Sequence, residues 1–534
     1  MSYFNSRRST VVARRGAVAT SQPLAAQAGL QMLIAGGNAV DAAVATAAAL
    51  GVLEPMSTGI GGDMFCLIWP AKEKRVVALN GSGRAPAAAD AEMMRHKGYQ
   101  KMPLDGKEVA CSVTVPGTVD GWQTALENYG TMTLKEVLKP AIEYARQGFV
   151  VSEIIAYAWQ DYATRLKARP SGQEFLLNGR APRYGEIMYL PTLASTLEMI
   201  SEGGKAAFYQ GELAEKTAAF VQAEGGWLTT EDLVAHTSTW DKPISTDYRG
   251  VTVWECPPNG QGLAALLALN IAEGFDIRAM EAQSAERYHT LIEAMRLSFA
   301  DALQYIADPR MQSVPVQALL SKDYAQQRRC FINPEQALQE VNYGEPLPAG
   351  DTVYLSVVDG EGNACSFINS LFHGSGLVVP GTGIALQNRG ACFSLNSAHP
   401  NFLQGRKRPY HTIIPAMATR DGELWLCFGV MGAFQQPQGH LQVISNKVDF
   451  DMDTQQALDA LRFSIDLDTD TIRLEAGVSE EVITGLEKRH HRVQVIEGYA
   501  RADFGGGQII ARDPDSGVLY AGSEPRKDGA AVGY

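Results

Sequence analysis

The chain has 534 residues, 46% of them hydrophobic and 20% charged, which is the composition of a globular protein too long for a single hydrophobic core. Its formal net charge is −13, from 46 basic and 59 acidic side chains. This balance argues against nucleic acid and anionic membranes as partners, because binding to phosphate needs a basic face and the chain offers only the short basic run 406–408.

Seven cysteines are scattered along the chain without any CxxC spacing, which indicates neither a zinc site nor a disulfide framework. Residues 1–15 are polar, contain four arginines and lack the apolar stretch of a secretory signal. The sequence contains no run of 18 apolar residues, so we expect no membrane span. Together these features predict a cytoplasmic protein in which most cysteines are buried thiols.

The segment 16–54 is rich in alanine and has a helical pattern. Gly36 predicts the end of one helix, and Asn38 with Asp41 three residues later resembles the cap of a second helix over 39–53. That second helix carries small residues on almost every face, so we expect it to be buried and closely packed against a sheet.

Two strands, 64–69 and 76–79, follow a glycine-rich loop over 55–63 that lacks the lysine of a phosphate loop. The next loop, 80–86, contains Arg84. An arginine in such a flexible loop can bind a carboxylate through two hydrogen bonds, although a surface charge is the commoner role.

The balance of predicted elements changes at residue 352, from mostly helices before it to mostly strands after it. The polar segment 320–350 is expected to be irregular and mobile. A helix-rich part and a strand-rich part predict an α+β sandwich assembled from both. The predicted helices are 134–147, 192–202, 263–271, 285–305, 455–463 and 479–488, and the predicted strands include 251–255, 352–359, 364–371, 376–379, 413–419, 423–430, 492–496, 507–513 and 518–522.

The junction between Asp351 and Thr352 is the most informative point of the sequence. The proline- and glycine-rich segment 345–350 ends directly on it, and a strand follows. A chain cut at this bond would leave Thr352 with a free α-amino group beside its hydroxyl, which are the parts of an N-terminal nucleophile. Taken alone, the local sequence favours an ordinary strand-opening threonine, because such junctions between loop and strand are common.

Six motifs in a fixed order change this interpretation. With them the chain resembles the γ-glutamyltranspeptidases, which are N-terminal nucleophile hydrolases, from about residue 16 to the end. The motifs are 36–43 (GGNAVDAA), the glycine-rich loop 55–62, 115–117 (VPG), Thr352 with 356–359 (SVVD), 407–409 (KRP) and 525–534 (PRKDGAAVGY).

The resemblance implies a four-layer αββα sandwich and a proenzyme that cleaves itself before Thr352. The products are a large piece, 1–351, and a small piece, 352–534, which stay associated. The new amine, with an ordinary pKa of about 7.7–8.0, can accept the hydroxyl proton of Thr352 as a general base. The threonine oxygen would then form an acyl-enzyme that water releases.

Other catalytic roles follow from the resemblance. The hydroxyl residue near the new amine falls on Ser370, with Asn369 as the alternative, because the hairpin is two residues shorter than in other members. The pair that binds the oxyanion falls on Gly432 and Ala433. Main-chain N–H groups donate the hydrogen bonds there, so an alanine in the second position is tolerable.

The substrate pocket departs from the family pattern. Ser82 stands where the family has the arginine that holds the substrate α-carboxylate, with Arg84 two residues later. Cys392 stands where it has the aspartate for the α-amino group, and Arg389 replaces a neighbouring glutamine. A site without a partner for the ammonium rejects γ-glutamyl substrates, because a buried charge would be left unpaired.

We therefore expect hydrolysis of a small carboxylate amide. Its carboxylate would meet Arg389 or Arg84, and Tyr410, His411 and Thr412, which follow the KRP motif, would complete the substrate site. The variant resembles the branch that includes the oxamate amidohydrolase of purine breakdown, which would yield oxalate and ammonia.

Two enzyme alternatives remain, a γ-glutamyl hydrolase or transpeptidase and a cephalosporin-type acylase. An alternative of another class is an unprocessed, inactive homologue that acts as a binding protein. No motif requires a metal or an organic cofactor, and the pair 490–491 (HH) is expected to be solvated surface. Pairing of two-piece protomers into a dimer is left open.

Overall fold

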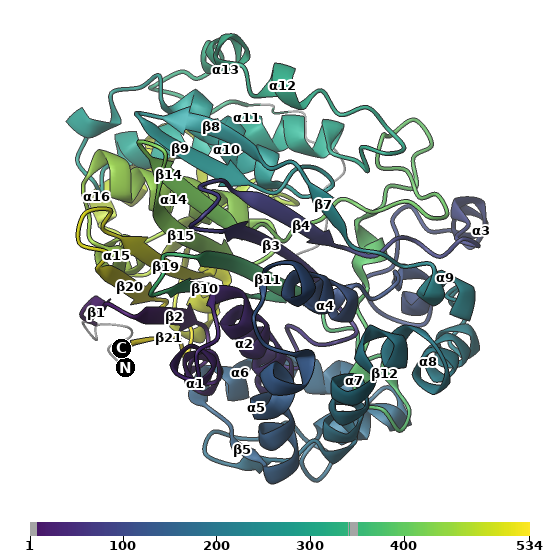
Figure 1. Cartoon of the computed structure of the whole chain (residues 1–534). Helices are drawn as coiled ribbons and strands as arrows, with labels where there is room; N and C mark the ends of the chain where they lie inside the picture. The colour runs from purple at the N-terminus through teal and green to yellow at the C-terminus, as the bar shows by residue number, and fades with distance from the viewer. Residues whose placement is uncertain (1–7, 340, 342–350) are drawn as a thin grey trace.

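Two seven-stranded sheets form the centre of the molecule in the computed structural model, which describes residues 8–339, 341 and 351–534 (Figure 1). The first sheet has the order β21 (Ala530–Gly533), β2 (Gly16–Thr20), β10 (Asp351–Asp359), β11 (Ala364–Phe372), β3 (Asp63–Trp69), β4 (Val77–Gly81) and β7 (Thr239–Asp241). The second has the order β1 (Val11–Ala13), β20 (Leu519–Ser523), β19 (Gly506–Arg512), β15 (Glu423–Met431), β14 (Ala416–Arg420), β9 (Val251–Glu255) and β8 (Ile244–Tyr248).

The two sheets pack face to face through β10 and β11 on one side and β15 and β19 on the other, and helices cover both outer faces. The predicted four-layer αββα sandwich is therefore confirmed. The first sheet is covered by α1 (Pro23–Ile34), α2 (Ala39–Leu53) and α4 (Thr118–Tyr129), with α5 (Leu134–Gln147), α6 (Glu153–Leu166), α7 (Pro191–Tyr209) and α8 (Glu212–Ala223) farther out. The second is covered by α10 (Gly262–Ala272), α14 (Gln435–Asp449) and α15 (Thr454–Asp459). Helices α11 (Ala285–Tyr305) and α13 (Lys322–Arg329) pack on α10, and α16 (Glu480–Lys488) packs on α11.

Helix α2 shows how the sequence specifies this packing. Every one of its residues is buried between α1, α5 and the strands β10 and β11, as its small side chains predict. Gly29 of α1 allows the close approach of the two helices, because a Cβ there would lie 2.2 Å from Thr46 Oγ1. The predicted capping box is confirmed, with Asn38 Oδ1 accepting from the N–H groups of Val40 and Asp41, and the Asp41 carboxylate accepting from the N–H of Asn38.

Short elements complete the fold. They are the three-stranded sheet β16 (Phe463–Asp466), β17 (Thr471–Glu475) and β18 (Arg492–Ile496), the pairs β5 (Phe149–Val150) with β6 (Ile187–Met188) and β12 (Val378–Val379) with β13 (Ile384–Ala385), and the helices α3 (Ala91–His96), α9 (Thr230–Val234) and α12 (Val316–Leu319).

The structure differs from the sequence predictions at several elements. The segment 16–54, expected to be helical, begins with strand β2. The helix predicted over 455–463 ends at Asp459, because the chain then enters β16. The segment expected to be irregular contains α13, whose first turn is capped by Ser321 Oγ. Helix α14 was not predicted, because its glutamines and Pro437 concealed it.

All seven cysteines are free, and six of them are buried. No helix in the described part of the chain is long and apolar enough to cross a membrane. The segment 345–350, which carried the prediction of a processing loop, lies outside the described residues.

Candidate active site

Thr352 lies at the start of β10, buried in the centre of the first sheet with 4% of its surface exposed. The pairing of β10 with β11 shifts at this residue, since Asp351 faces Phe372 and Val353 faces Asn369. A bulge of this kind turns a side chain away from the regular alternation of a strand and is common beside active sites. Here the Thr352 hydroxyl lies 3.1 Å from the Ser370 hydroxyl.

Ser370 connects Thr352 to a cation. Its oxygen accepts hydrogen bonds from the N–H of Phe372 (2.8 Å) and from Arg389 Nη2 (3.1 Å). Phe372 has a φ of +69°, a conformation that is uncommon for a bulky residue and that clusters at functional sites. Asn369, the alternative to Ser370, accepts instead from the Trp122 indole N–H and donates to Thr118.

Arg389 is fully buried in a short 3₁₀ helix, Arg389–Cys392. Its Nη1 donates to Thr412 Oγ1 (2.6 Å), and the guanidinium carbon lies 4.3 Å from the centre of the Phe372 ring. Within the described residues no carboxylate forms an ion pair with it, and its Nε has no hydrogen-bond acceptor. Burial therefore lowers the pKa of this arginine, and a bound anion would satisfy its open donor.

His411 forms no hydrogen bond with Thr352 in the part of the chain that the structure describes. Its Nε2 lies 3.0 Å from Asp63 Oδ2, and both side chains are fully buried. The other Asp63 oxygen accepts from the N–H of Gly83 and from Gln387 Nε2. Burial raises the pKa of Asp63 to about 6, against the opposing field of Arg389. Burial and the two nearby arginines lower the pKa of His411 well below its ordinary value, so the ring is neutral.

The remaining predicted pocket residues serve other contacts. The Tyr410 hydroxyl donates to Gln261, and Arg84 Nη1 donates to the Thr237 carbonyl (3.4 Å). Ser82 is buried against Asn80 and Asn259. These placements give no geometric support to direct substrate contacts by Tyr410 or Arg84.

Gly432 and Ala433 form the turn between β15 and α14. Both have positive φ, +127° and +46°. In the described part of the chain neither N–H has a hydrogen-bond acceptor. The N-terminus of α14 follows directly at Gln435, so two free N–H groups and the positive end of a 15-residue helix lie together. This arrangement suits the stabilisation of a negative oxygen.

A cavity of about 360 Å³ opens beside Thr352 and Gly432, the two predicted site residues that line it. Three cationic side chains that the sequence analysis did not single out also line it: Arg165, Arg473 and Lys527. Lys527 belongs to the C-terminal motif, but nothing in its sequence context shows which way it points.

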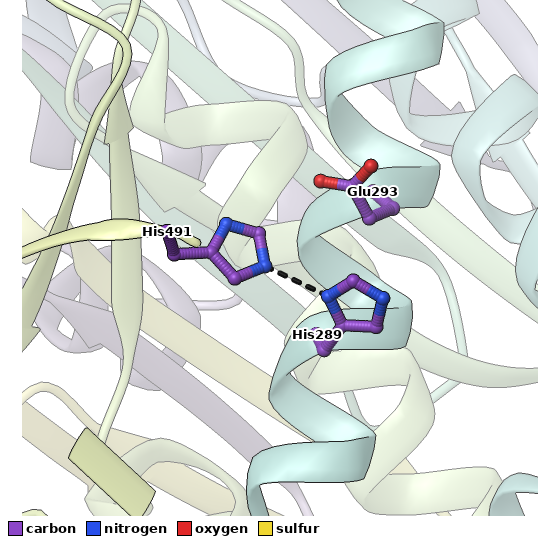
Figure 2. Close-up of side chains that lie close together, drawn as sticks. All are labelled: His289, Glu293 and His491. Atoms are coloured by element: carbon purple, nitrogen blue, oxygen red, sulfur yellow. Dashed lines mark hydrogen bonds between the residues drawn. The ribbon is translucent and has the colours of Figure 1, made fainter. Parts of the chain in front are cut away.

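One group of side chains among the described residues could hold a metal ion, formed by His289 and Glu293 of α11 and by His491 (Figure 2). His289 Nδ1 lies 2.7 Å from His491 Nε2, a direct hydrogen bond between the two rings. Glu293 already accepts from Arg296 (2.8 Å) and from the N–H of Leu338 (2.9 Å), and the charge of Arg296 opposes a cation. The expectation that His491 is solvated surface is wrong, because the ring is buried against α11, whereas His490 is exposed.

Comparisons with known proteins found similar sequences and structures over nearly the whole chain. Residues 25–534 match the family model described as gamma-glutamyltranspeptidase. A glutathione hydrolase-like proenzyme of Bacillus subtilis (strain 168) is 38% identical over 98% of this chain and 99% of its own. An oxamate amidohydrolase proenzyme of Klebsiella pneumoniae is 35% identical over 98% of this chain and all of its own. The crystal structure of a cephalosporin acylase from Bacillus halodurans superposes with a TM-score of 0.92 and 46% identity, covering 100% of this chain and 98% of that one.

Proposed function

The chain belongs to the γ-glutamyltranspeptidase family, and on this premise we propose that Thr352 is the N-terminal nucleophile that cleaves the amide of a small carboxylate. Since its relatives are proenzyme hydrolases, the chain is an amidohydrolase with a self-cleaving proenzyme. The cut falls at the Asp351–Thr352 bond and gives the pieces 1–351 and 352–534. The single observation that carries the proposal is the series of contacts Thr352–Ser370–Arg389, which joins a nucleophile to an anion-binding group.

The cut creates the base of the reaction. The free amine of Thr352 accepts the proton of the threonine hydroxyl, and Ser370 holds that hydroxyl in place. The threonine oxygen attacks the amide carbon, and the N–H groups of Gly432 and Ala433 stabilise the negative oxygen that forms. The amine returns its proton to the leaving nitrogen. Water then hydrolyses the acyl-threonine and restores the hydroxyl.

Arg389 binds the substrate carboxylate. It is buried next to Ser370, so a carboxylate bound to its open donor lies close to the carbonyl under attack. Oxamate, whose carboxylate is bonded directly to the amide carbon, is the first substrate to test, and its products are oxalate and ammonia. One of the relatives is an oxamate amidohydrolase.

Cys392 argues against a γ-glutamyl substrate. The thiol is fully buried, and burial raises its pKa to about 11, so it is neutral and cannot balance a substrate ammonium. The placement of Arg389 beside it adds a repelling charge.

An acylase for longer acyl groups is the second candidate. The cavity of about 360 Å³ is of the usual size of pockets for whole drug-sized ligands, about 300–1,000 Å³, whereas oxamate has only six non-hydrogen atoms. The 46% identical structure is that of a cephalosporin acylase.

A denaturing gel combined with a substrate panel tests the proposal. Wild-type protein should give two bands and release ammonia from oxamate, and Thr352→Ala should give one intact band and no release. Release of glutaric acid from glutaryl amides without oxamate turnover would favour the acylase. Strong turnover of a γ-glutamyl anilide would contradict the role given to Arg389 and Cys392, and a single wild-type band would leave only a binding protein.

A further inference from the structure

Lys527 is a cation in the wall of the cavity that Thr352 also lines, and it has no ionic partner among the residues that the structure describes. The other two cations there are neutralised, Arg165 by Asp161 (2.7 Å) and Arg473 by Asp466. Asp468 also lines the cavity, but no ion pair or hydrogen bond joins it to Lys527 in the described part of the chain. Asp503, which lines the cavity as well, has an interaction of its own.

The neighbours of Lys527 in the sequence fix its main chain on both sides. Arg526 is fully buried and forms ion pairs with Glu475 and Glu524. Asp528 accepts hydrogen bonds from Ser152 Oγ (2.7 Å) and from the N–H groups of Ile154 and Ile155 at the start of α6. A loop anchored in this way keeps Lys527 at the cavity and reduces the entropy lost when its side chain binds an anion.

The stem of Lys527 also lies close to the turn proposed to stabilise the negative oxygen. A Cβ on Gly506 would lie 3.0 Å from Lys527 Cγ and 2.2 Å from Met431 Cε, so a side chain at Gly506 would displace both. Gly506 pairs with Met431 across β19 and β15, and Gly432 follows Met431. Lys527 therefore lies in the wall of the open cavity, whereas Arg389 is fully buried, is bonded to Ser370 and is not among the described residues that line this cavity.

We propose that Lys527 binds a substrate carboxylate that lies several bonds away from the amide that is cleaved, at a position distinct from that of a carboxylate bound to Arg389. This rests on the proposed function of Thr352. The carboxylate can belong to the acyl chain, as in glutaramate, or to the leaving amine, as in N-oxalylglycine, and both present the same chemistry to an ammonium group. Lys527 is thus a specificity-determining residue, and the enzyme prefers amides with a remote carboxylate over otherwise similar amides without one.

The test compares Lys527→Met with wild type on three substrates. Two of the substrates, glutaramate and N-oxalylglycine, carry the remote carboxylate. On whichever of them the wild type hydrolyses, we expect kcat/KM to fall about tenfold, mainly because KM rises. This is the size of effect expected from the loss of one charge-assisted hydrogen bond in a partly buried site. The value on N-methyloxamate, which lacks the remote carboxylate, should change less than twofold. Lys527→Arg should restore the preference, and Lys488→Met, at an exposed lysine of α16, should leave all three values unchanged.

Binding of glutarate, measured by calorimetry on the intact wild-type and Lys527→Met proteins, supplies a readout that does not need turnover. It should weaken about tenfold in the variant. Equal losses on all three substrates, or equal glutarate affinity in both proteins, would overturn the role of Lys527. If the wild type is unprocessed and inactive but Lys527→Met still lowers the affinity for glutarate, the function proposed for Thr352 is contradicted and the anion site at Lys527 is retained.

Discussion

Arg389 is the residue on which the assignment of the substrate depends. It is fully buried, and within the described residues it forms no ion pair, although the buried carboxyl of Asp63 lies close enough to feel its charge. A fully buried cation is costly unless it is paired, so proteins seldom keep one without a function. Two of its nitrogens are held by Thr412 and Ser370, which leaves the guanidinium oriented beside the nucleophile.

Replacement of Arg389 by lysine should lower kcat/KM for a carboxylate amide about 10- to 100-fold, because one ammonium cannot reproduce the two directed hydrogen bonds of a guanidinium. Steady-state kinetics on oxamate measure this loss. Arg84→Lys, at a loop arginine that donates to the Thr237 carbonyl rather than to Ser370, is the matched control and should change kcat/KM less than twofold. Equal losses in both variants would refute the assignment.

Asp63 should make stability depend on pH. Its pKa rises on folding from 3.8 to about 6, so the folded protein holds a proton that the unfolded chain has lost. The stabilisation from this group is complete below pH 3.8 and is lost as pH rises through about 6. Between pH 4.5 and 7 the loss amounts to about 2 kcal/mol, at 1.36 kcal/mol per pKa unit.

Urea unfolding of wild type and Asp63→Asn at these two pH values checks the effect. The asparagine cannot titrate, so its free energy of unfolding should gain about 2 kcal/mol relative to wild type as pH rises. Because only the change with pH is compared, any constant cost of the substitution cancels. Parallel pH profiles would show that Asp63 keeps an ordinary pKa.

At the scale of elements, the cap of α2 joins helix, loop and sheet. The Asp41 carboxylate accepts from the N–H groups of Asn38, Thr131 and Met132 and from the Thr131 hydroxyl. Asp41→Ala removes a fully buried carboxylate and leaves its partly buried donors unsatisfied, so it should lower the free energy of unfolding by about 2–4 kcal/mol. Asp90→Ala, which removes two similar bonds at the exposed start of α3, should cost about 1 kcal/mol or less.

Thermal unfolding of the two variants, followed by circular dichroism, compares the caps directly. A larger loss of thermal midpoint in Asp90→Ala than in Asp41→Ala would contradict the account of α2.

Sequence patterns predicted these elements where a local rule determines the structure. The cap at Asn38, the all-round burial of α2 and the hairpin after Thr352 follow from residue types a few positions apart. The polar helix α14 did not follow, because its glutamines are buried through distant contacts, such as that of Gln435 with the Phe463 carbonyl. For the same reason the environments of Tyr410, His411 and Lys527 could not be read from the sequence, although Thr352 could be selected from the order of the motifs.

At the scale of the whole molecule, the strands of the two proposed pieces alternate. In the first sheet, β10 and β11 of the small piece lie between β2 and β3 of the large piece. In the second sheet, β20, β19, β15 and β14 of the small piece lie between β1 and β9 of the large piece. Separation of the pieces would break both sheets and expose the core, so a cut at residue 351 should not release either piece.

Size-exclusion chromatography of the processed protein should therefore give one peak that contains both pieces, and only denaturant should separate them. Elution of either piece alone from native protein would contradict the strand order of the two sheets.

The most direct test of the central claim, that Thr352 becomes the nucleophile by self-cleavage, is intact-mass spectrometry of the purified protein with and without a slowly hydrolysed amide. We expect a small piece that begins at Thr352 and gains the mass of the acyl group at that residue, together with an uncut Thr352→Ala chain. An uncut wild-type chain that still hydrolyses the amide, or an acyl group on another residue, would contradict it.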